Sequence, residues 1–463
     1  MKLMKINKSF DSKLINNFCK LSGDYNPIHT SSNYSSKKII HGIAIVLSAL
    51  ENLNHRYNAI SSIDVKFLNF LNINEKIIFK YKKKNNNLII EGSSLNLDII
   101  YIKLSFFEKN NFLDRKNFFT NGIPPKSKVL EFKSSDKKKL HSLPLFLSNS
   151  ELKLIYPKFN KSFNFNIISA LLCLTRIVGM KIPGLYSIFS GFKLNFSKDF
   201  IADNKLNYQI VDFDKRWNLT KIKLSNKFTN GEILAFERPK PVIQPSYKTI
   251  KSKIKKLNFK NKKILVIGGS SGIGEIFVKI LSFYGADLTF TYLKNIENSK
   301  RIIKECKNKK INYFKLDINH TNLKKLSNVI KKEKFDQIYY FATPKIFNKE
   351  SININVSVFD EFYKFYVFEI LKILNLVDKI TPKKITFLLA STVASTENFN
   401  NLKEYILVKS FAEKIFKLNI FSNIKTKIYN FKRVKTDQTS SIHHTVKFND
   451  IVVEAKNAIN LMK

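Results

Sequence analysis

The chain has 463 residues, of which 44% are hydrophobic, and a formal net charge of +44 at pH 7. This composition excludes global disorder, and the length predicts about three domains. The positive charge is mostly lysine, is spread along the chain and includes no arginine-rich arm, so dedicated nucleic-acid binding is not expected. A basic surface would still attract anionic substrates such as coenzyme A, acyl carrier protein or a dinucleotide.

Targeting signals and cysteine usage indicate a protein of the cytoplasm. The first residues lead into no apolar segment typical of a signal peptide. The longest uncharged apolar run near the N-terminus, 39–50, is too short to span a bilayer. Three scattered cysteines argue against a disulfide framework. We therefore expect a cytoplasmic protein without a membrane span.

Residues 1–120 are predicted to form the first unit. An apolar helix is expected at 43–53, and it is followed by segments with the pattern of β-strands. These strands are expected at 61–70, 76–81, 88–93 and 99–107. One central helix followed by antiparallel strands predicts an α+β fold in which the sheet wraps round the helix.

The turn before this helix carries a carboxylate and an imidazole close together. Residues 22–29 read SGDYNPIH, so Asp24 and His29 are five positions apart, and His41-Gly42 precede the helix. The free N–H groups at the helix start, plausibly that of Gly42, would stabilise a developing thioester oxyanion. Asp24 and His29 would share general acid/base work on a water and on a carbon proton. A structural turn with a loop histidine is the alternative, and His41 fits helix-start packing as well as substrate contact.

Residues 121–240 are predicted to repeat the plan of the first unit. An apolar helix is expected at 167–178, a turn that leads into a strand at 183–196, and further strands at 206–211, 218–224 and 232–236. The acidic and histidine turn is missing from this copy, so a true duplicate would have no acid/base machinery of its own.

The SGDYNPIH turn with His41-Gly42 resembles the hydratase motif of the MaoC-like, (R)-specific enoyl-CoA hydratase family, which has the hotdog fold. The resemblance implies that Asp24 and His29 are the catalytic pair. Double-hotdog members of that family join one catalytic half to one half that has lost the motif and helps to house the acyl chain. The resemblance therefore implies an α+β double hotdog with the N-terminal half catalytic.

Several prolines predict a linker over 241–259, and residues 260–463 then alternate strand and helix. This alternation of strands and helices predicts an α/β, Rossmann-type, doubly wound parallel sheet. After the strand expected at 264–267 comes a glycine-rich turn that opens a helix, where a pyrophosphate can approach the backbone and the helix N-terminus. The expected cofactor-binding residues of this turn are Gly268, Ser270, Ser271, Gly272, Ile273 and Gly274.

Tyr405 and Lys409 are four residues apart, on one face of a predicted helix. A positive charge at Lys409 would lower the pKa of the Tyr405 phenol, so that it exchanges a proton near neutral pH. With 18 tyrosines and many lysines, the same spacing also arises by chance, as at Tyr34/Lys38. Only the Tyr405 pair follows a buried strand ending in a serine, Ser391.

The glycine turn, Ser391, Tyr405 and Lys409 together resemble the short-chain dehydrogenase/reductase family over nearly all of 260–463. The resemblance implies that Tyr405 exchanges the proton, that Lys409 contacts the nicotinamide ribose and that Ser391 orients the carbonyl. It further implies cofactor contacts for the residues at three other motif positions, Asp317, Ala342 and Thr436.

The sequence departs from this family's pattern at several positions. The Asn-Ala-Gly that usually closes the fourth strand is Ala342-Thr343-Pro344, and Tyr366 stands where the proton relay has an asparagine. The gap from Ser391 to Tyr405 is one residue longer than the commonest spacing, and the Pro-Gly before Thr436 is absent. Cofactor binding tolerates these changes more readily than fast turnover does.

The end of the second strand of the Rossmann unit carries no carboxylate for a ribose 2′-hydroxyl, and Lys294 lies close by. NADP is therefore favoured over NAD. No metal site is expected, because His443 and His444 have no Cys or carboxylate partners at ligand spacing.

The best single hypothesis is a bifunctional enzyme acting on an acyl thioester of coenzyme A or acyl carrier protein. The reductase part would interconvert 3-oxo and 3-hydroxy groups, and the hotdog part would interconvert the hydroxy compound with its enoyl form. A short-chain reductase of a specialised polyketide, lipid or surface-sugar pathway, with an independent hotdog, is one alternative. A C-terminal dinucleotide-binding scaffold without turnover is another. The short-chain reductase resemblance implies a homo-oligomer, a dimer or a tetramer, while the double hotdog can form a pseudo-dimer within one chain.

Overall fold

The structure is a computed structural model that describes residues 4–31, 38–53, 59–108, 117–131, 139–159, 163–198, 201–294, 296–306, 310–320, 322–346, 353–396, 402–439 and 447–463. The chain divides into two compact units, Met1–Lys240 and Pro241–Lys463. His443 and His444 lie outside the described residues.

The first half of the N-terminal unit surrounds a short apolar helix with strands. Its elements are β1 (Met4–Ser9), α1 (Ser12–Ser22), α2 (Pro27–Thr30), α3 (Gly42–Leu50), β2 (Ile60–Phe67), β3 (Lys76–Lys84), β4 (Asn87–Ser94) and β5 (Leu97–Phe106). α3 is buried on all sides from Ile43 to Leu50, as expected for a helix that is hydrophobic around its whole circumference. β4 alternates buried and half-buried residues, which is the period of a strand with one face on a core.

The second half follows a similar plan, in which helices precede four consecutive strands. Its elements are β6 (Thr120–Asn121), β7 (His141–Pro144), β8 (Phe146–Leu147), α4 (Asn149–Ile155), α5 (Phe165–Arg176), the π-helix η3 (Ile177–Lys181), β9 (Ser187–Phe196), β10 (Lys205–Asp214), β11 (Leu219–Ser225) and β12 (Thr229–Glu237). α5 is the counterpart of α3, and it too is buried on all sides from Asn166 to Arg176.

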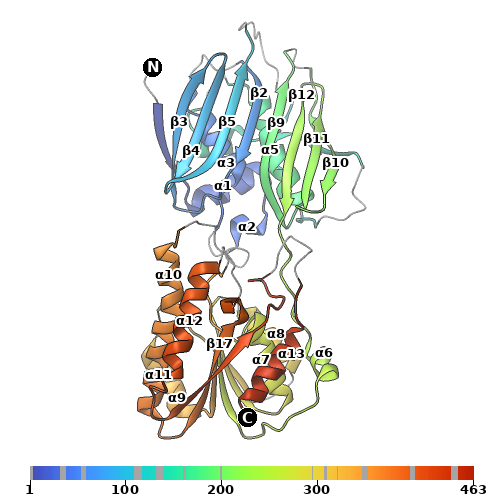
Figure 1. Ribbon diagram of the computed structural model, residues 1–463. Coiled ribbons are helices and arrows are strands. Elements are labelled where there is room, and N and C mark those ends of the chain that lie inside the picture. Colours follow the sequence, from blue (N-terminus) through green and yellow to red (C-terminus); the bar gives the residue numbers. More distant parts are fainter. Residues whose placement is uncertain are drawn as a thin grey trace. The chain divides into compact units, whose positions relative to one another are not determined.

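The two halves share one ten-stranded sheet. Its order is β1-β3-β4-β5-β2-β9-β12-β11-β10-β7, so the order of the first five strands is mirrored in the last five. The halves meet where β2 pairs antiparallel with β9, with Ser62 opposite Asn195. α1, α3 and α5 lie on the same side of the sheet (Figure 1) and share one hydrophobic core with it.

The C-terminal unit is a parallel sheet between helices. Its elements are α6 (Tyr247–Lys253), β13 (Lys263–Ile267), α7 (Gly272–Phe283), β14 (Asp287–Tyr292), α8 (Ile296–Cys306), β15 (Ile311–Lys315), α9 (Leu323–Glu333), β16 (Gln337–Tyr340), α10 (Val356–Tyr363), the π-helix η4 (Lys364–Phe368), α11 (Glu369–Ile380), β17 (Ile385–Thr392), the 3₁₀-helix η5 (Val393–Thr396), α12 (Lys403–Lys417), β18 (Ile424–Phe431) and α13 (Ile451–Leu461).

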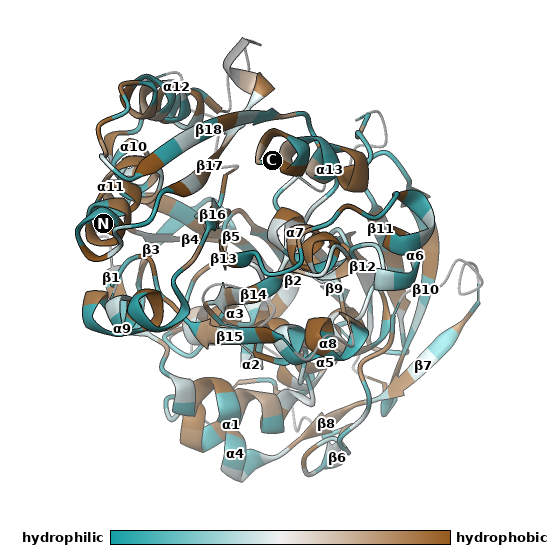
Figure 2. Cartoon of the chain, turned by 90° about the horizontal axis from the view of Figure 1, so that it is seen from below, coloured by the Kyte–Doolittle hydropathy of each residue, from teal (hydrophilic) through white to brown (hydrophobic). Residues whose placement is uncertain are grey.

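The six strands of this unit are in the order β15-β14-β13-β16-β17-β18, and every neighbouring pair is parallel. The order reverses between β13 and β16, which is the topological switch point where α/β sheets bind their ligands. One core packs α6, α7, α8 and α13 on one face, and a second core packs α9 to α12 on the other. These helices carry both hydrophobic and hydrophilic stretches (Figure 2). The predicted doubly wound Rossmann-type sheet is thus confirmed.

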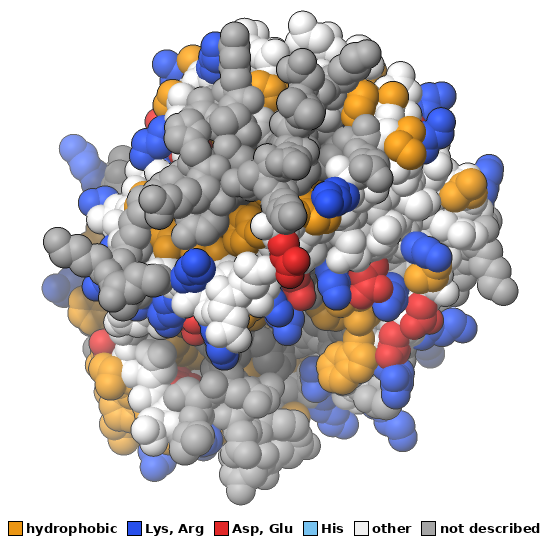
Figure 3. Space-filling model, turned by 90° about the horizontal axis from the view of Figure 1, so that it is seen from above, with side chains coloured by type: hydrophobic (Ala, Val, Ile, Leu, Met, Phe, Trp, Pro, Cys, Tyr) orange, Lys and Arg blue, Asp and Glu red, His pale blue; other side chains and the backbone are white. Residues whose placement is uncertain are grey.

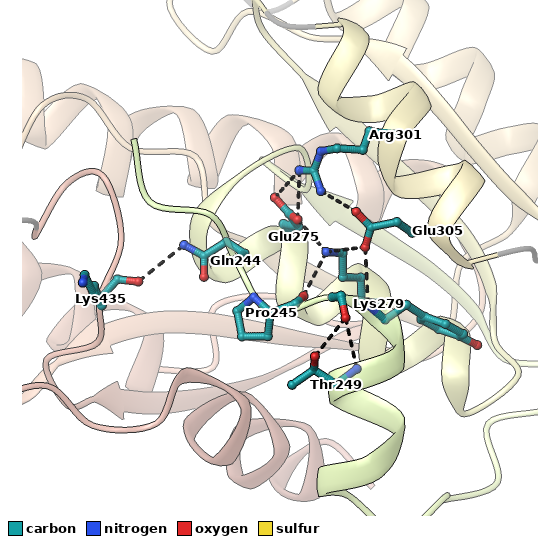
Figure 4. Close-up of polar contacts among 10 residues, drawn as sticks. Gln244, Pro245, Thr249, Glu275, Lys279, Arg301, Glu305 and Lys435 are labelled. Atoms are coloured by element: carbon teal, nitrogen blue, oxygen red, sulfur yellow. Dashed lines mark hydrogen bonds and ion pairs between the residues drawn. The ribbon is translucent and has the colours of Figure 1, made fainter. Parts of the chain in front are cut away.

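The predicted linker is partly helical, and a buried network of charged side chains from α7 and α8 binds its backbone (Figure 4). Lys279 of α7 is fully buried and pairs with Glu275 at 2.7 Å and with Glu305 at 2.8 Å. Its ammonium also donates to the Pro245 carbonyl at 3.0 Å. Arg301 of α8 pairs with both glutamates, so every charge in the group faces an opposite one. The network attaches the segment before α6 to the Rossmann core.

Lysine and arginine side chains are distributed around the face drawn in Figure 3 rather than gathered in one patch. Among the described residues, no helix is both long enough and apolar enough to cross a membrane.

Candidate functional site

The turn that carries Asp24 is fixed by hydrogen bonds at both ends. α1 ends at Gly23, which has the left-handed φ of 73° that ends many helices. Asn26 then caps α2, because its side chain accepts from the Ile28 amide at 3.1 Å. The Asn26 side chain also donates to the carbonyls of Gly179 and Gly184, at 2.8 and 2.9 Å. The turn is therefore braced by the second half of the unit.

The Asp24 carboxylate is almost fully buried and accepts one hydrogen bond on each oxygen. The backbone N–H of Asn26 donates to Oδ1 at 3.0 Å, and the Thr175 hydroxyl donates to Oδ2 at 2.6 Å. Thr175 belongs to the last turn of α5. Gly179 lies so close that a Cβ there would overlap both carboxylate oxygens. Neither Thr175 nor Gly179 was singled out from the sequence, because neither lies in a motif.

His29 and His41 are stacked, with ring centroids 3.6 Å apart and an angle of 23° between the rings. His29 Nδ1 lies 2.7 Å from the Ile39 carbonyl, which can only accept, so Nδ1 carries the proton and Nε2 is left as a base. By the same argument His41 Nε2 donates to the Asp24 carbonyl at 3.2 Å. His41 is 1% exposed and therefore part of the wall of the site.

Burial sets the protonation of this group. It raises the pKa of the Asp24 carboxyl, and the His29 imidazole, the Thr175 hydroxyl and the Asn26 amide oppose that rise. Burial also lowers the pKa of His29, against the attraction of Asp24. The pKa of His41 is lowered well below its usual range by burial and by His29. The two pKa values of Asp24 and His29 thus move toward each other, which suits proton exchange.

Potential ligand atoms of Asp24, His29 and His41 lie within 4.8 Å of one another, which is close enough to raise the question of a metal ion. An imidazole binds a metal in its own ring plane. Two rings stacked 3.6 Å apart do not share such a position, so one of them would have to turn. The geometry therefore fits proton transfer better than metal binding.

Gly42 begins α3 beside the ring of Phe67, and a Cβ at this position would come within 2.7 Å of that ring. The His41 side chain does not cap the helix, and the Gly42 amide has no acceptor among the described residues. An unused N–H at a helix N-terminus can stabilise an anionic oxygen.

The predicted dinucleotide turn lies at the switch point of the C-terminal sheet. Gly268 has a φ of 82°, and a Cβ there would lie 2.7 Å from the Ala342 amide nitrogen, so Gly268 and Ala342 adjoin across β13 and β16. Gly274 packs α7 onto the turn, since a Cβ there would overlap the Gly268 carbonyl oxygen. Gly272 has a φ of 56° and lies beside Thr436.

The N-terminus of α7 is open. Ser271 is the N-cap residue, but its side chain makes no capping hydrogen bond. Ser270 is half-buried and Ser271 is exposed, and Ile273 is half-buried in the first turn. The left-handed glycines and the uncapped amides form a cradle that fits a pyrophosphate. The structure thus places Thr436 and Ala342 at the same turn, as the resemblance implied, while their contacts with a cofactor stay a prediction.

Lys294 and Asp317 lie beyond the C-terminal ends of β14 and β15. Lys294 is exposed, and the segment from Thr289 to Lys294 contains no carboxylate. Asp317 accepts from the Asn319 amide at 2.9 Å, which closes a short turn. Adjacent parallel strands end at the same edge of the sheet, the edge at which β13 meets the glycine turn.

Tyr405 and Lys409 lie on α12, next to Tyr366 of η4. The Lys409 ammonium is 3.7 Å from the centroid of the Tyr366 ring and 5.7 Å from that of Tyr405. It donates to the Ala390 carbonyl at 2.6 Å. The Tyr366 hydroxyl contacts the Thr343 hydroxyl.

The structure brings Thr392, rather than Ser391, to Tyr405. The Ser391 hydroxyl donates to the Glu413 carboxylate of α12. A side-chain hydrogen bond with Thr392 opposes the rise in the pKa of Tyr405 that burial causes. Thr392 precedes Tyr405 by one residue less than Ser391 does, and the long spacing noted in the sequence was the signal that could have indicated it.

Burial lowers the pKa of the Lys409 ammonium to about 7, and the Glu413 carboxylate opposes that fall. Lysine 409 is therefore divided between its charged and neutral forms near neutral pH. A charged form would assist Tyr405 and a neutral form would not.

No protein-family model matches this sequence, and no curated protein matches it either. Solved structures similar to it cover less than half of the chain. A short-chain type dehydrogenase/reductase from Mycobacterium ulcerans is 15% identical, covers 45% of this chain and 85% of its own, and has a TM-score of 0.40. BdcA in complex with NADPH is 18% identical, with 44% and 87% covered and a TM-score of 0.38. A putative short-chain dehydrogenase from Shigella flexneri complexed with NADP is 16% identical, with 44% and 92% covered and a TM-score of 0.39. The fold of the C-terminal unit rests on its own strand order.

Proposed function

We propose that the chain is a bifunctional enzyme of acyl-thioester metabolism. Residues 1–120 and 121–240 are a catalytic MaoC-like hotdog and its non-catalytic repeat, 241–259 are a linker, and 260–463 are a short-chain dehydrogenase/reductase domain. The mirrored strand order round two buried helices supports the double hotdog. The reductase interconverts 3-oxo and 3-hydroxy thioesters, and the hotdog interconverts the hydroxy and enoyl forms.

The observation that carries the hydratase proposal is the pair formed by the buried Asp24 and the half-buried His29 beside the N-terminus of α3. A water held between the two side chains gives a proton to the unprotonated His29 Nε2 as its oxygen bonds to C3 of the enoyl group. Negative charge then develops on the thioester oxygen, where the Gly42 amide donates a hydrogen bond. The pair returns one proton to C2, so the enzyme ends the turnover in its starting state.

Hydration is tested by following the ultraviolet absorbance of crotonyl-CoA and longer enoyl thioesters with the full chain. The wild type and the control Asp98→Asn, at an exposed site in the same unit, should consume the enoyl group. Asp24→Asn and His29→Ala should lose the activity by at least about 100-fold, as expected when an acid/base group is removed. Equal rates in wild type and both site variants would refute the proposal.

The reductase proposal rests on the cradle at Gly268–Gly274 and on the Tyr405–Lys409 pair across the switch point. The cradle and the uncapped start of α7 would hold the pyrophosphate of NADP, and the bound cofactor would supply or accept the hydride. The absence of a carboxylate after β14, with Lys294 exposed nearby, favours a 2′-phosphate over a free hydroxyl. Tyr405 gives a proton to the carbonyl oxygen, and Thr392 or Ser391 orients that oxygen.

Acetoacetyl-CoA and NADPH test this half. Tyr405→Phe should reduce oxidation of NADPH by at least about 100-fold, while the half-exposed control Tyr363→Phe should not. Fluorescence titration of NADPH separates binding from turnover, because neither variant should lose affinity. NADH binding as tightly as NADPH would contradict the cofactor assignment.

A second candidate for the C-terminal unit is a dinucleotide-binding scaffold without turnover. The position of the Lys409 ammonium over Tyr366 and on the Ala390 carbonyl favours it, since neither contact serves Tyr405. NADPH binding without consumption by any 3-oxoacyl thioester would support this candidate. Turnover that starts only with carrier-protein or specialised substrates would support the pathway-specific alternative.

We also propose that the protein is a cytoplasmic homo-oligomer. Its three cysteines are buried and unpaired, which suits a reducing compartment. α10, η4 and α12, which pack against one another, expose Val356, Phe368 and Phe411, and Tyr363 contacts Phe411. Light scattering on the purified chain tests the oligomeric state, and a fluorescent fusion tests the location.

A further inference from the structure

We propose that Thr175 is a positioning residue for Asp24, and that the second half of the N-terminal unit therefore helps to build the acid/base site. This inference rests on the hydratase function proposed above. It changes the role of the second half, which carries no acid/base turn, from a passive neighbour to a part of the site.

The contact that carries the inference is short and buried. The Thr175 hydroxyl donates to Asp24 Oδ2 at 2.6 Å, and the two residues are 4% and 1% exposed. Water competes little with a hydrogen bond at such a place, and a hydroxyl that donates to a carboxylate makes one of the stronger hydrogen bonds in proteins. Thr175 lies in the last turn of α5, a helix that is buried along its whole length, so the donor is itself held in place.

The two oxygens of Asp24 are held from different halves. The Asn26 amide, on the same turn as Asp24, donates to Oδ1, and Thr175 donates to Oδ2. Two donors on opposite oxygens fix the rotation of the carboxylate about its Cβ–Cγ bond. The Thr175 bond therefore determines which lone pairs of Asp24 face His29.

The chain after Thr175 is shaped to approach Asp24. It continues as the π-helix η3, a wide turn that is frequent at functional sites. This turn brings Gly179 against the carboxylate, where only a residue without a side chain fits. The Gly179 carbonyl also accepts from the Asn26 side chain at 2.8 Å. Three successive contacts thus join the end of α5 to the catalytic turn.

The Thr175 bond also tunes proton exchange. Burial raises the pKa of Asp24, and the hydrogen bond to Thr175, which favours the ionised carboxylate, opposes that rise. Without the hydroxyl, Asp24 would hold a proton at higher pH. The acid limb of the pH–rate profile should then move toward higher pH, a change that a purely structural role for Thr175 would not produce.

The test uses the full chain with three substitutions. Thr175→Val removes the hydroxyl and keeps the shape, and Thr175→Ser keeps the hydroxyl. Thr220→Val is the matched control, because Thr220 is fully buried in the same unit and its hydroxyl has no partner among the described residues. Melting temperatures identify any variant that fails to fold. If Thr175→Val fails, Thr175→Cys, a weaker donor of similar size, takes its place.

For hydration of crotonyl-CoA, we expect Thr175→Val to lower kcat by about tenfold and to leave KM nearly unchanged. The acid limb of the kcat profile should move up by about one pH unit. Thr175→Ser should keep both kcat and the position of the acid limb close to the wild-type values, and Thr220→Val should match the wild type. An active wild type with an unshifted profile in Thr175→Val would overturn the inference while leaving the hydratase function intact.

A second readout does not depend on activity. The Asp24 carboxyl is titrated by ¹³C NMR in protein labelled at the aspartate carboxyl carbons, with its signal identified by its loss in Asp24→Asn. Its pKa should be higher in Thr175→Val than in the wild type and in Thr220→Val. An inactive wild type would refute the proposed function, and this titration would still decide whether Thr175 controls Asp24. Equal pKa values in Thr175→Val and the wild type would overturn the inference.

Discussion

The half-buried His29 and the buried His41 form a stack that lines the N-terminal site, and its chemistry depends on both rings being neutral before each turnover. His29 keeps a free Nε2 only while its Nδ1–H donates to the Ile39 carbonyl. His41, at 1% exposed, faces His29, the Asp24 backbone and the Cys19 thiol. A proton on one ring would disfavour a second proton on the other, because the ring centroids are only 3.6 Å apart.

This stack predicts an acid-sensitive fold. The pKa of His41 lies well below that of a histidine in the unfolded chain, so the unfolded state binds the proton first as the pH falls. The stabilisation is complete above about pH 6.5 and is lost as the pH falls below that value. We expect the melting temperature to drop between pH 7.5 and pH 5.5, and to drop less in His41→Gln. The raised pKa of Asp24 makes an opposite contribution to the pH dependence. This contribution is present in both the wild type and His41→Gln, so it cancels when their melting temperatures are compared.

The exposed residue His320 supplies the control for this measurement. His320→Gln should keep the full pH dependence of the wild type. A His41→Gln chain with the same loss of melting temperature as the wild type would show that His41 is not the group responsible.

Adding a single methyl group at Gly179 should lower the rate of catalysis in a chain that still folds. A Cβ there overlaps both oxygens of Asp24, so Gly179→Ala must displace the carboxylate. Displacement by about 1 Å costs on the order of 100-fold in rate. We expect kcat for hydration to fall by that factor, as measured by enoyl absorbance. Asp98→Asn, at an exposed site in the same unit, is the control; an active Gly179→Ala chain would contradict the geometry.

At the scale of elements, local patterns could be predicted and long-range contacts could not. Asp24 and His29 share one turn, so their proximity follows from five residues of sequence. The alternation of strands and helices after residue 260 likewise predicted the parallel sheet, which the strand order confirms. Thr175 meets Asp24 across 151 positions, and no local pattern encodes such a contact. Lys409 shows the same limit, because its spacing from Tyr405 did not reveal that Tyr366 lies beneath its ammonium.

The buried charge network of α7 and α8 makes a prediction about stability. Lys279 neutralises Glu275 and Glu305 and is fully buried. Lys279→Met leaves Glu275, whose side chain is 3% exposed, with Arg301 as its remaining cation. Removing one member of a buried ion group costs about 3–5 kcal/mol, so urea should unfold the C-terminal unit at a much lower concentration.

Lys300→Met is the control for this substitution, since Lys300 forms an exposed pair with Glu297 and its loss should leave the urea midpoint unchanged. A Lys279→Met midpoint equal to that of the wild type would mean that Arg301 alone balances the two glutamates.

At the scale of the whole molecule, the two compact units have separate cores. One core lies within residues 1–240, and the other two lie within 241–463. We expect each fragment, expressed alone, to unfold cooperatively by circular dichroism. We also expect each to keep the activity proposed for it, because each candidate site is built from residues of one unit. A fragment that is unfolded or aggregated would show that its core is incomplete without the other.

The seam between β2 and β9 has a consequence for how this protein tolerates truncation. In the intact sheet both strands are interior, since β2 also pairs with β5 and β9 with β12. A chain cut between the halves would expose each strand as a bare edge of unsatisfied N–H and C=O groups. Such an edge recruits the edge of another copy. Genes that lost either half would therefore produce self-associating chains rather than a smaller enzyme.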